Sequence, residues 1–329
     1  MNIVVTGSVA FDYIMSFPGR FTDHILPDKL ESISLSFLVD DMRKVYGGCA
    51  PNIAYSLALL GEGPRIMATA GEDGAEYRDW LGKNGVDTSL LRICPDCYTA
   101  SFFVSTDLDQ NQIASFYTGA MARARELSFY DSAVENGGGK KPNMVIISPN
   151  DPEAMCKYAR ECRELGIAYI YDPSQQVARV DGNELAEGLT GAQVLILNDY
   201  EYGILEKKTG LDQAQLLERA STIVVTLGER GSRIVTGEEI FEVPIAEAAA
   251  VLEPTGVGDA YRAGLIKGMV HRCPWPVTGR IGALAAAYVI EHPGPQPAPY
   301  TIEEFVTRYR ENFGDTPELE DLLGHSTTE

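Results

Sequence analysis

The chain has 329 residues, 45% of them hydrophobic, and 47 acidic against 27 basic residues give it a formal charge of −20 at pH 7. This size suits one large globular domain with an inserted piece, or two ordinary domains. Lysine and arginine form no cluster of the kind that nucleic acid needs, so the acidic chain is not expected to bind nucleic acid or an anionic membrane. No run of 18 apolar residues occurs, so no transmembrane helix is expected.

The first predicted strand spans residues 3–6 and has no basic region before it, so we expect no signal peptide. Similar short apolar runs end in turn residues at 66–70, 144–147, 168–171, 194–197 and 223–227, and helical patterns at 50–60, 153–165 and 212–220 lie among them. This alternation predicts parallel strands joined by helices in a three-layer α/β/α sandwich. Such sheets bind ligands at the carboxyl ends of their strands.

Two segments interrupt the alternation. Residues 99–106 and 112–118 have period-two patterns around a polar turn and predict a hairpin, and the irregular segment 12–45 includes a strand predicted at 32–39. We interpret both as one small β-sheet that projects as a lid, formed by residues 13–42 and 98–118. The body then comprises residues 1–12, 43–97 and 119–329. Because an exposed sheet has unpaired edges, we expect a homodimer through the lid.

Two polar residues precede or open early elements. Asp12 follows the first strand, where a carboxylate could bridge two vicinal hydroxyls, although a lone acid there is more often a turn residue. Two glycines lead into Pro51, which is favoured in the first turn of a helix. Asn52 would therefore lie near the loop mouth, either against substrate hydroxyls or in solvent.

Later strand ends carry a second group of candidates. Asn198 and Glu201 lie one helical turn apart and could orient magnesium-bound water. A capping box that only closes the helix start is a serious alternative. Thr226, Gly228 and Gly231 end the next strand, where they could line nucleotide phosphates or simply make a turn.

The strongest local signal is Thr-Gly-Val-Gly-Asp at residues 255–259, followed by apolar residues at helical spacing. The glycines let the backbone approach an anion, and bare amides at a helix start suit a phosphoryl group. Asp259 could then accept the proton of a substrate hydroxyl. Alternatively, Asp259 only complements the helix dipole, which is worth about 0.3–1 kcal/mol.

Taken together, these motifs resemble the ribokinase-like (PfkB) family of carbohydrate and nucleoside kinases, in order and spacing from residue 3 to about residue 294. Within that family, the stretches 6–8, 17–21, 34–41, 114–117, 150–155, 172–176 and 198–201 are most similar to adenosine kinases of the actinobacterial type. Glu253-Pro254 departs from the usual Asp-Thr of the second signature, and Cys49 and Pro51 depart from the small residues usual in the first. None of these departures removes a chemical group assigned here.

The resemblance implies ATP-dependent phosphorylation of the 5′-hydroxyl of adenosine, with Mg²⁺ oriented through water near Glu201. Asp259 would be the base, and the amides of Gly256, Val257 and Gly258 the anion hole. The implied nucleoside contacts are Ser8, Asp12, Gly48 and Asn52 on the ribose, Ser36 on the base, Phe102 and Phe116 on facing lid strands as a sandwich for the purine, and Arg179 on closure. Asn198, Thr226, Gly228 and Gly231 would serve the nucleotide.

The aromatic pair also favours a purine on physical grounds, because stacking contributes about 1–3 kcal/mol per base. Packing of the lid or of a dimer remains the other interpretation of Phe102 and Phe116. A sugar kinase, a nucleoside kinase of broad specificity and a non-catalytic binding protein stay open as alternatives. No G-x-G-x-x-G follows the first strand, which disfavours a dinucleotide-dependent dehydrogenase.

Six cysteines in a chain of this length are too few for a disulfide scaffold, so we expect reduced thiols and a cytoplasmic protein. Cys94 and Cys97 form a lone C-x-x-C with no second pair at metal-binding spacing, which makes a zinc or redox site the lesser interpretation.

Overall fold

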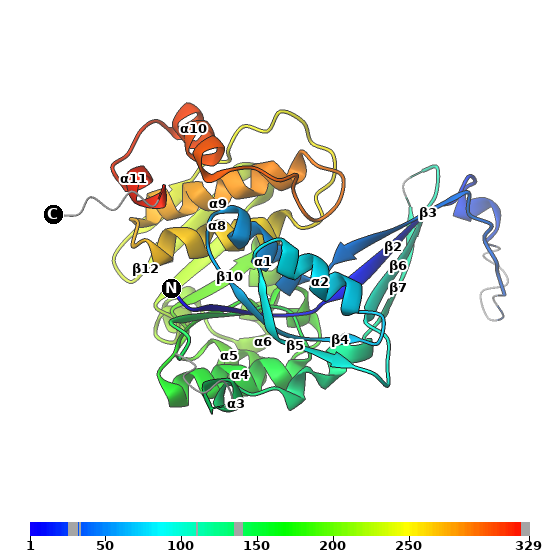
Figure 1. Ribbon diagram of the computed structural model, residues 1–329, viewed down its shortest axis with the longest axis horizontal. Helices are drawn as coiled ribbons and strands as arrows, with labels where there is room; N and C mark the ends of the chain where they lie inside the picture. The colour runs from blue at the N-terminus through cyan, green and yellow to red at the C-terminus, as the bar shows by residue number, and fades with distance from the viewer. Residues whose placement is uncertain (26–31, 33, 110, 135–140, 324–329) are drawn as a thin grey trace.

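A computed structural model describes residues 1–25, 32, 34–109, 111–134 and 141–323 of the chain. A large sheet forms its centre, with helices on both faces, and a smaller sheet projects from one side (Figure 1). The predicted three-layer α/β/α sandwich with a small separate sheet is confirmed.

In the described part of the chain the large sheet has nine strands, in the order β13-β12-β11-β10-β9-β8-β1-β4-β5. All neighbours from β11 to β5 pair in parallel, and β12 and β13 complete the sheet as antiparallel strands. The strands are β1 (Ile3–Thr6), β4 (Arg65–Gly71), β5 (Asp87–Cys94), β8 (Met144–Ile147), β9 (Ala168–Tyr171), β10 (Val194–Asn198), β11 (Thr222–Thr226), β12 (Ser232–Thr236) and β13 (Ile240–Val243).

Successive strand residues point to opposite faces, and each face has its own hydrophobic core. Ile3 and Val5 of β1 pack in one core, whereas Val4 between them packs in the other. The first core is covered by α1 (Cys49–Leu59), α2 (Ala75–Lys83), α8 (Val257–Val270), α9 (Trp275–Ile290), α10 (Ile302–Phe313) and α11 (Glu318–Leu322). The second is covered by α3 (Phe129–Val134), α4 (Pro152–Leu165), α5 (Gly182–Leu189), α6 (Asp199–Thr209) and α7 (Gln213–Leu217).

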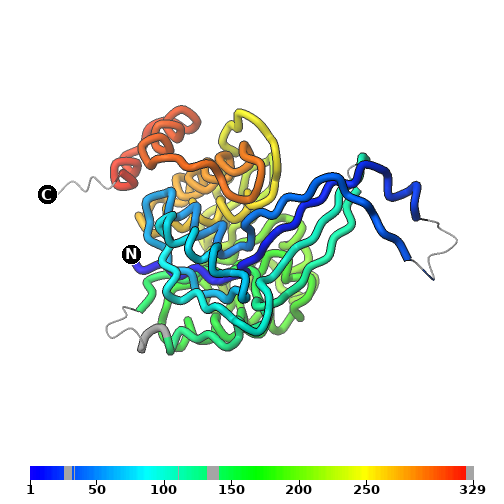
Figure 2. Tube along the Cα trace, turned by 45° about the vertical axis from the view of Figure 1, so that its right-hand side comes forward, coloured from blue at the N-terminus to red at the C-terminus, as the bar shows by residue number. Residues whose placement is uncertain are grey.

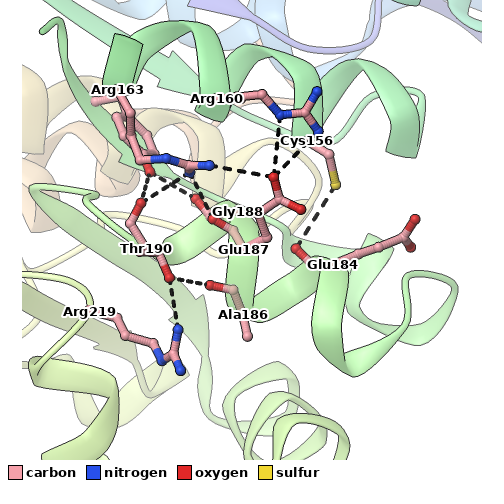
Figure 3. A network of polar contacts seen from close by, with 10 residues as sticks. Cys156, Arg160, Arg163, Glu184, Ala186, Glu187, Gly188, Thr190 and Arg219 are labelled. Atoms are coloured by element: carbon pink, nitrogen blue, oxygen red, sulfur yellow. Dashed lines mark hydrogen bonds and ion pairs between the residues drawn. The ribbon is translucent and has the colours of Figure 1, made fainter.

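A polar network fixes the end of α5 against α4 and the sheet (Figure 3). Arg163 Nη1 donates to the carbonyl oxygens of Glu187, at 2.9 Å, and Thr190, at 3.2 Å. The hydroxyl of Tyr169 donates to the carbonyl oxygen of Thr190, at 2.7 Å, and also lies 3.1 Å from that of Gly188. The last carbonyls of a helix have no helical partner, so these donors satisfy groups that would otherwise need water.

The smaller sheet has the strand order β3-β2-β6-β7 and consists of β2 (Ala10–Ser16), β3 (Asp41–Gly47), β6 (Ala100–Thr106) and β7 (Gln112–Tyr117). Strands β6 and β7 form the predicted antiparallel hairpin. All six residues of the edge strand β7 are exposed. The homodimer expected through this sheet stays a prediction, as does a cytoplasmic location.

The strand predicted at 32–39 is wrong. Residues 34–39 form no strand, and the partner of β2 is instead β3, which starts at Asp41. Phe37 packs edge-on against Phe17 and Phe21, with ring centroids 5.0 and 4.9 Å apart, so its apolar character serves a small cluster rather than a sheet. Residues 17–25 and 34–40 extend beyond the far end of the small sheet, away from the body (Figure 2).

None of the helices in the described ranges is long and apolar enough to cross a membrane. All six cysteines are free thiols.

Candidate active site

The site forms where the parallel strands end and the chain turns into helices. Ser8, after β1, donates its N–H to Pro149 O at 2.8 Å, and Asp172, after β9, donates its N–H to Ile147 O at 2.9 Å. Asn198 pairs with Thr226 at the ends of β10 and β11. The predicted edge of the sheet therefore gathers polar residues from strands that are far apart in the sequence, as parallel strands require.

Helix α8 begins at this edge, directly after Gly256. Gly256 has φ +80°, and a Cβ atom there would lie 2.2 Å from Pro295 O, so only glycine suits the position. Asp259 is the third residue of the helix and is half-buried. The first amides of a helix lack helical acceptors, and here the N–H of Val257 makes only a long contact of 3.4 Å to Pro254 O. The anion hole and base predicted at residues 255–259 stay a prediction.

Asn52 of α1 meets Asp259 directly. Its Nδ2 donates to Asp259 Oδ2 at 2.9 Å, and its Oδ1 accepts from Gln296 Nε2 at 3.2 Å. Gln296 also donates to the hydroxyl of Tyr77 at 3.1 Å, which itself donates to Gly47 O at 3.1 Å. Because both ends of the Asn52 amide are occupied, its NH₂ group is held toward the carboxylate. Asn52 is 4% exposed, so the solvated alternative is wrong.

The two acids of the site share an unusual protonation range. Burial raises the pKa of Asp259 to about 6, against the opposing effects of Arg262 and the Asn52 hydrogen bond. Burial also raises the pKa of Asp12 to about 6, with the charges of Glu253 and Asp259 adding to the shift. A carboxylate with a pKa near neutrality suits a general base, since it is ionised at pH 7 and still attracts a proton.

Asp12 and the two predicted aromatic residues lie in one row across the small sheet. Asp12 pairs with Phe102 on β6, and Phe102 pairs with Phe116 on β7, so the three side chains share a face. Phe103 lies on the opposite face and stacks on Tyr13, with ring centroids 4.7 Å apart. Phe102 and Phe116 are cross-strand neighbours in one sheet, about 5 Å apart at Cβ, so they lie side by side and would contact a base from one face. The predicted sandwich of a purine between the two rings is therefore not the arrangement found.

The other predicted acceptor residues divide into two groups. Ser8 Oγ accepts from the N–H of Cys49 at 3.3 Å, and Gly48 packs so closely that a Cβ would lie 2.5 Å from Ser8 O, so both belong to the site edge. Ser36 does not. The small sheet joins the body at the end where Ala10 pairs with Gly47, and its far end is where Ser16 pairs with Asp41. Ser36 is exposed and lies beyond that far end.

On the nucleotide side, Asn198 and Glu201 form a complete capping box, as the alternative interpretation proposed. Asn198 N–H donates to Glu201 Oε2 at 3.0 Å, and Ser174 Oγ donates to Oε1 at 3.1 Å. Each oxygen keeps a lone pair for water, so the cap does not exclude a role toward bound magnesium. No group of three or more His, Cys, Asp or Glu side chains in the described segments is arranged to hold a metal ion.

Three further nucleotide candidates occupy the loop after β11. Thr226 ends that strand, and Gly228 and Gly231, with φ +60° and +85°, bound the short 3₁₀ helix Gly228–Arg230. Arg179 follows the 3₁₀ helix Ser174–Ala178, and its exposed side chain makes no hydrogen bond or ion pair with the described residues. Its role on closure stays a prediction.

Two residues of the site were not predicted. Gln296 comes from a proline-rich turn that carries no motif for it. Arg262 is 6% exposed and pairs with the fully buried Asp172, with Nε 2.5 Å from Oδ2 and Nη2 2.6 Å from Oδ1. The sequence feature that could have indicated a buried role for Arg262 is its position among the small residues Ala260, Ala263 and Gly264. The structure shows that residues 260–268 of this helix are all buried.

A glycine-led helix start with a carboxylate in its first turn, at the carboxyl edge of a parallel sheet, is an arrangement that suits phosphoryl transfer. The chain belongs to the pfkB family of carbohydrate kinases, whose model matches residues 5–301. The family expected from the motifs is thus confirmed.

Individual relatives are similar over nearly the whole chain. A nucleoside kinase of Methanothermobacter thermautotrophicus is 29% identical over 97% of this chain and 98% of its own. The structure of Burkholderia thailandensis nucleoside kinase in complex with inosine has a TM-score of 0.84 at 36% identity, covering 96% of this chain and 99% of that one. The same enzyme in complex with ADP-inosine gives 0.82 at 37%, covering 96% and 97%. These relatives are nucleoside kinases, so the likeness expected to adenosine kinases is supported only at that coarser level.

Proposed function

We propose that the chain is an ATP-dependent nucleoside kinase that phosphorylates the 5′-hydroxyl of purine nucleosides, adenosine in particular, to give the 5′-monophosphate. The observation that carries the proposal is the row Asp12, Phe102 and Phe116 on the face of one sheet. A carboxylate for ribose hydroxyls next to two aromatic rings matches the two halves of a nucleoside. The likeness to a nucleoside kinase bound to inosine supports the same class of acceptor.

In the proposed reaction Asp259 accepts the proton as the 5′-oxygen attacks the γ-phosphorus of ATP. A bond forms between this oxygen and phosphorus, the bond to the bridging oxygen breaks, and ADP leaves with the electron pair. The amides of Gly256, Val257 and Gly258 would stabilise charge on the transferring group. Asn52 holds the Asp259 carboxylate in place through its 2.9 Å hydrogen bond.

Magnesium bound to the nucleotide phosphates would offset their charge, and Glu201 could orient its water ligands through the two carboxylate oxygens described above. Thr226, Gly228 and Gly231 would line the phosphates from the neighbouring strand end. We further propose that the small sheet, together with residues 17–25 and 34–40 beyond its far end, acts as a lid that excludes water during transfer. Closure is the step that would bring Ser36 and Arg179 nearer to the nucleoside.

The acceptor is tested with a panel of adenosine, inosine, cytidine, ribose and fructose, each with γ-labelled ATP and magnesium. We expect kcat/KM for adenosine to exceed that for ribose by at least about 10²-fold, because a free sugar forgoes base stacking of about 1–3 kcal/mol and the orientation it provides. Equal rates with adenosine and inosine would establish a broad purine kinase. A preference for a free sugar would overturn the nucleoside assignment.

The aromatic row gives a matched pair of variants. Phe116→Ala is expected to raise KM for adenosine by about 5- to 100-fold, the equivalent of one lost stacking contact. Phe103→Ala removes a ring of the same size, 40% exposed against 41% for Phe116, from the opposite face. Its KM should stay within about twofold of wild type. Similar changes in both variants would mean that the rings only pack the sheet.

The alternatives are a nucleoside kinase of broad specificity, which the acceptor panel tests as above, a sugar kinase and a non-catalytic binding protein. The acceptor panel also separates the sugar kinase, and the binding protein requires that purified protein transfers no phosphoryl group to any acceptor.

A further inference from the structure

Arg262 is the sixth residue of α8, but its side chain reaches back to the start of the helix. Long helical side chains lean back toward the N-terminus and cover the residue one turn earlier. Here that residue is Gly258, where a Cβ atom would lie 2.7 Å from Arg262 Nη1. The guanidinium thus stands beside the anion-hole loop, with the other two nitrogens paired to Asp172.

The surroundings of this guanidinium are unusually acidic. Burial alone would lower the pKa of Arg262, but the charges of Asp172, Asp259 and Glu201 raise it above the ordinary value. A buried ion pair gives little net stability compared with well-packed apolar residues, so stability alone does not account for it. A cation near the positive N-terminal end of a helix is also unfavourable unless it helps to bind an anion there.

Resting on the proposed function, we propose that Arg262 is a positioning residue that holds Asp259 ionised beside the anion hole, with Asp172 acting on the base in the opposite sense. The two residues act on Asp259 in opposite directions. The guanidinium of Arg262, next to Gly258, favours the ionised form of Asp259, and the carboxylate of Asp172 disfavours that form. Both effects contribute to the pKa of Asp259 with these signs.

Other groups face Asp259 as well, and they stay constant in the test. Asn52 and Cys49 approach from α1 and favour the ionised carboxylate, whereas Asp12 on β2 and Tyr77 on α2 are neighbours whose own pKa values the Asp259 charge raises. Cys49 also feels the charges of Asp172 and Arg262, and its own side chain is unchanged in every variant.

The proposal predicts shifts of opposite sign. In Arg262→Gln the acidic limb of kcat/KM should move upward by about 1 pH unit, because a nearby cation is lost. In Asp172→Asn it should move downward, because the guanidinium is no longer offset. The double variant, which keeps a neutral hydrogen-bonding pair, should return toward the wild-type limb. Arg262→Gln should also lose about 10²-fold in kcat through misplacement of the base.

A purely structural ion pair gives a different pattern, namely loss of activity and thermal stability in both single variants with an unmoved limb. That result, or shifts of the same sign, overturns the proposal. Arg262→Lys keeps the charge but not the two-pronged contact. It should keep the limb within about 0.3 pH unit while kcat falls, and a limb that follows Arg262→Gln instead would exclude a charge effect.

A second measurement does not depend on the acceptor. In protein labelled with ¹³Cγ-aspartate, the Asp259 carboxyl is titrated by NMR in wild type, Arg262→Gln, Asp172→Asn and the double variant, with Asp259→Asn as the assignment blank. The same opposite shifts are expected without substrate. If the wild type phosphorylates no acceptor, the proposed function fails, yet this titration still decides whether Arg262 controls Asp259.

Discussion

Replacing Asp259 by Asn is expected to reduce kcat for phosphoryl transfer by about 10²–10⁴-fold, the contribution of a general base. In the wild type, Asn52 Nδ2 lies 2.9 Å from Asp259 Oδ2. Asn at position 259 has the same size and keeps an oxygen that can accept this hydrogen bond, so the site should keep its shape. KM should change little. The measurement is steady-state kinetics with γ-labelled ATP on the best acceptor of the panel.

Stability provides the control for this variant. The pKa of Asp259 is about 6 in the folded protein, above its ordinary value, so the folded state binds the proton more tightly than the unfolded chain. The stability that this proton contributes is present below the ordinary pKa and is lost as pH rises through about 6. Asn never ionises, and Asp259→Asn should therefore match or exceed the wild-type Tm at pH 7.5. An inactive variant with a lower Tm would point to a folding defect, and unchanged transfer would show that Asp259 is not the base.

Gly256→Ala is the second substitution with a large expected effect. Its φ of +80° lies in the left-handed region, and the new methyl carbon would stand 2.2 Å from Pro295 O, which is backbone and not free to rotate away. Left-handed strain costs about 1–2 kcal/mol, and overpacking adds about 1–3 kcal/mol. We expect a loss of about 2–5 kcal/mol in unfolding free energy, together with a fall in kcat as the anion-hole loop shifts.

Two glycines separate the parts of this effect. Gly210 has φ +68° with no atom near its Cβ direction, so Gly210→Ala isolates the backbone strain. Gly203 lies inside α6 with equally open space, and Gly203→Ala should stabilise the protein slightly through helix propensity. Urea unfolding of the three variants gives the comparison. A Gly256→Ala variant no less stable than Gly210→Ala would mean that the Pro295 contact is loose.

The body of the fold was readable from the sequence because buried parallel strands are short, continuous and apolar. The runs at 3–6, 144–147 and 168–171 became β1, β8 and β9 with the same limits. Strand β3 was missed for the opposite reason. Its first four residues are exposed, so neither face of this part of the strand requires apolar side chains. The alternation of serine with apolar residues at 32–39 led to a strand being predicted there instead.

The site was only partly predictable, and the limit again has a physical cause. Asp259 and Asn52 stand in local motifs that mark helix starts, so the sequence indicates them directly. Arg262 and Gln296 matter because of what they touch, Asp172 ninety residues earlier and Asn52 at the other end of the chain. A helical arginine and a turn glutamine have no local pattern that reveals such partners.

The way in which the small sheet is attached limits how it can move. Four stretches of chain cross between it and the body: from β1 into β2, from β3 into α1, from β5 into β6, and from β7 into the 3₁₀ helix Gly119–Glu126. The four strands are hydrogen-bonded side by side, so they resemble a ribbon fixed along its width. Such a ribbon bends readily about one axis but resists twisting. Asp12, Phe102 and Phe116 form one row across this ribbon, so when it bends as the proposed lid the three side chains would move together, and the far end at Ser16 and Asp41 would move most.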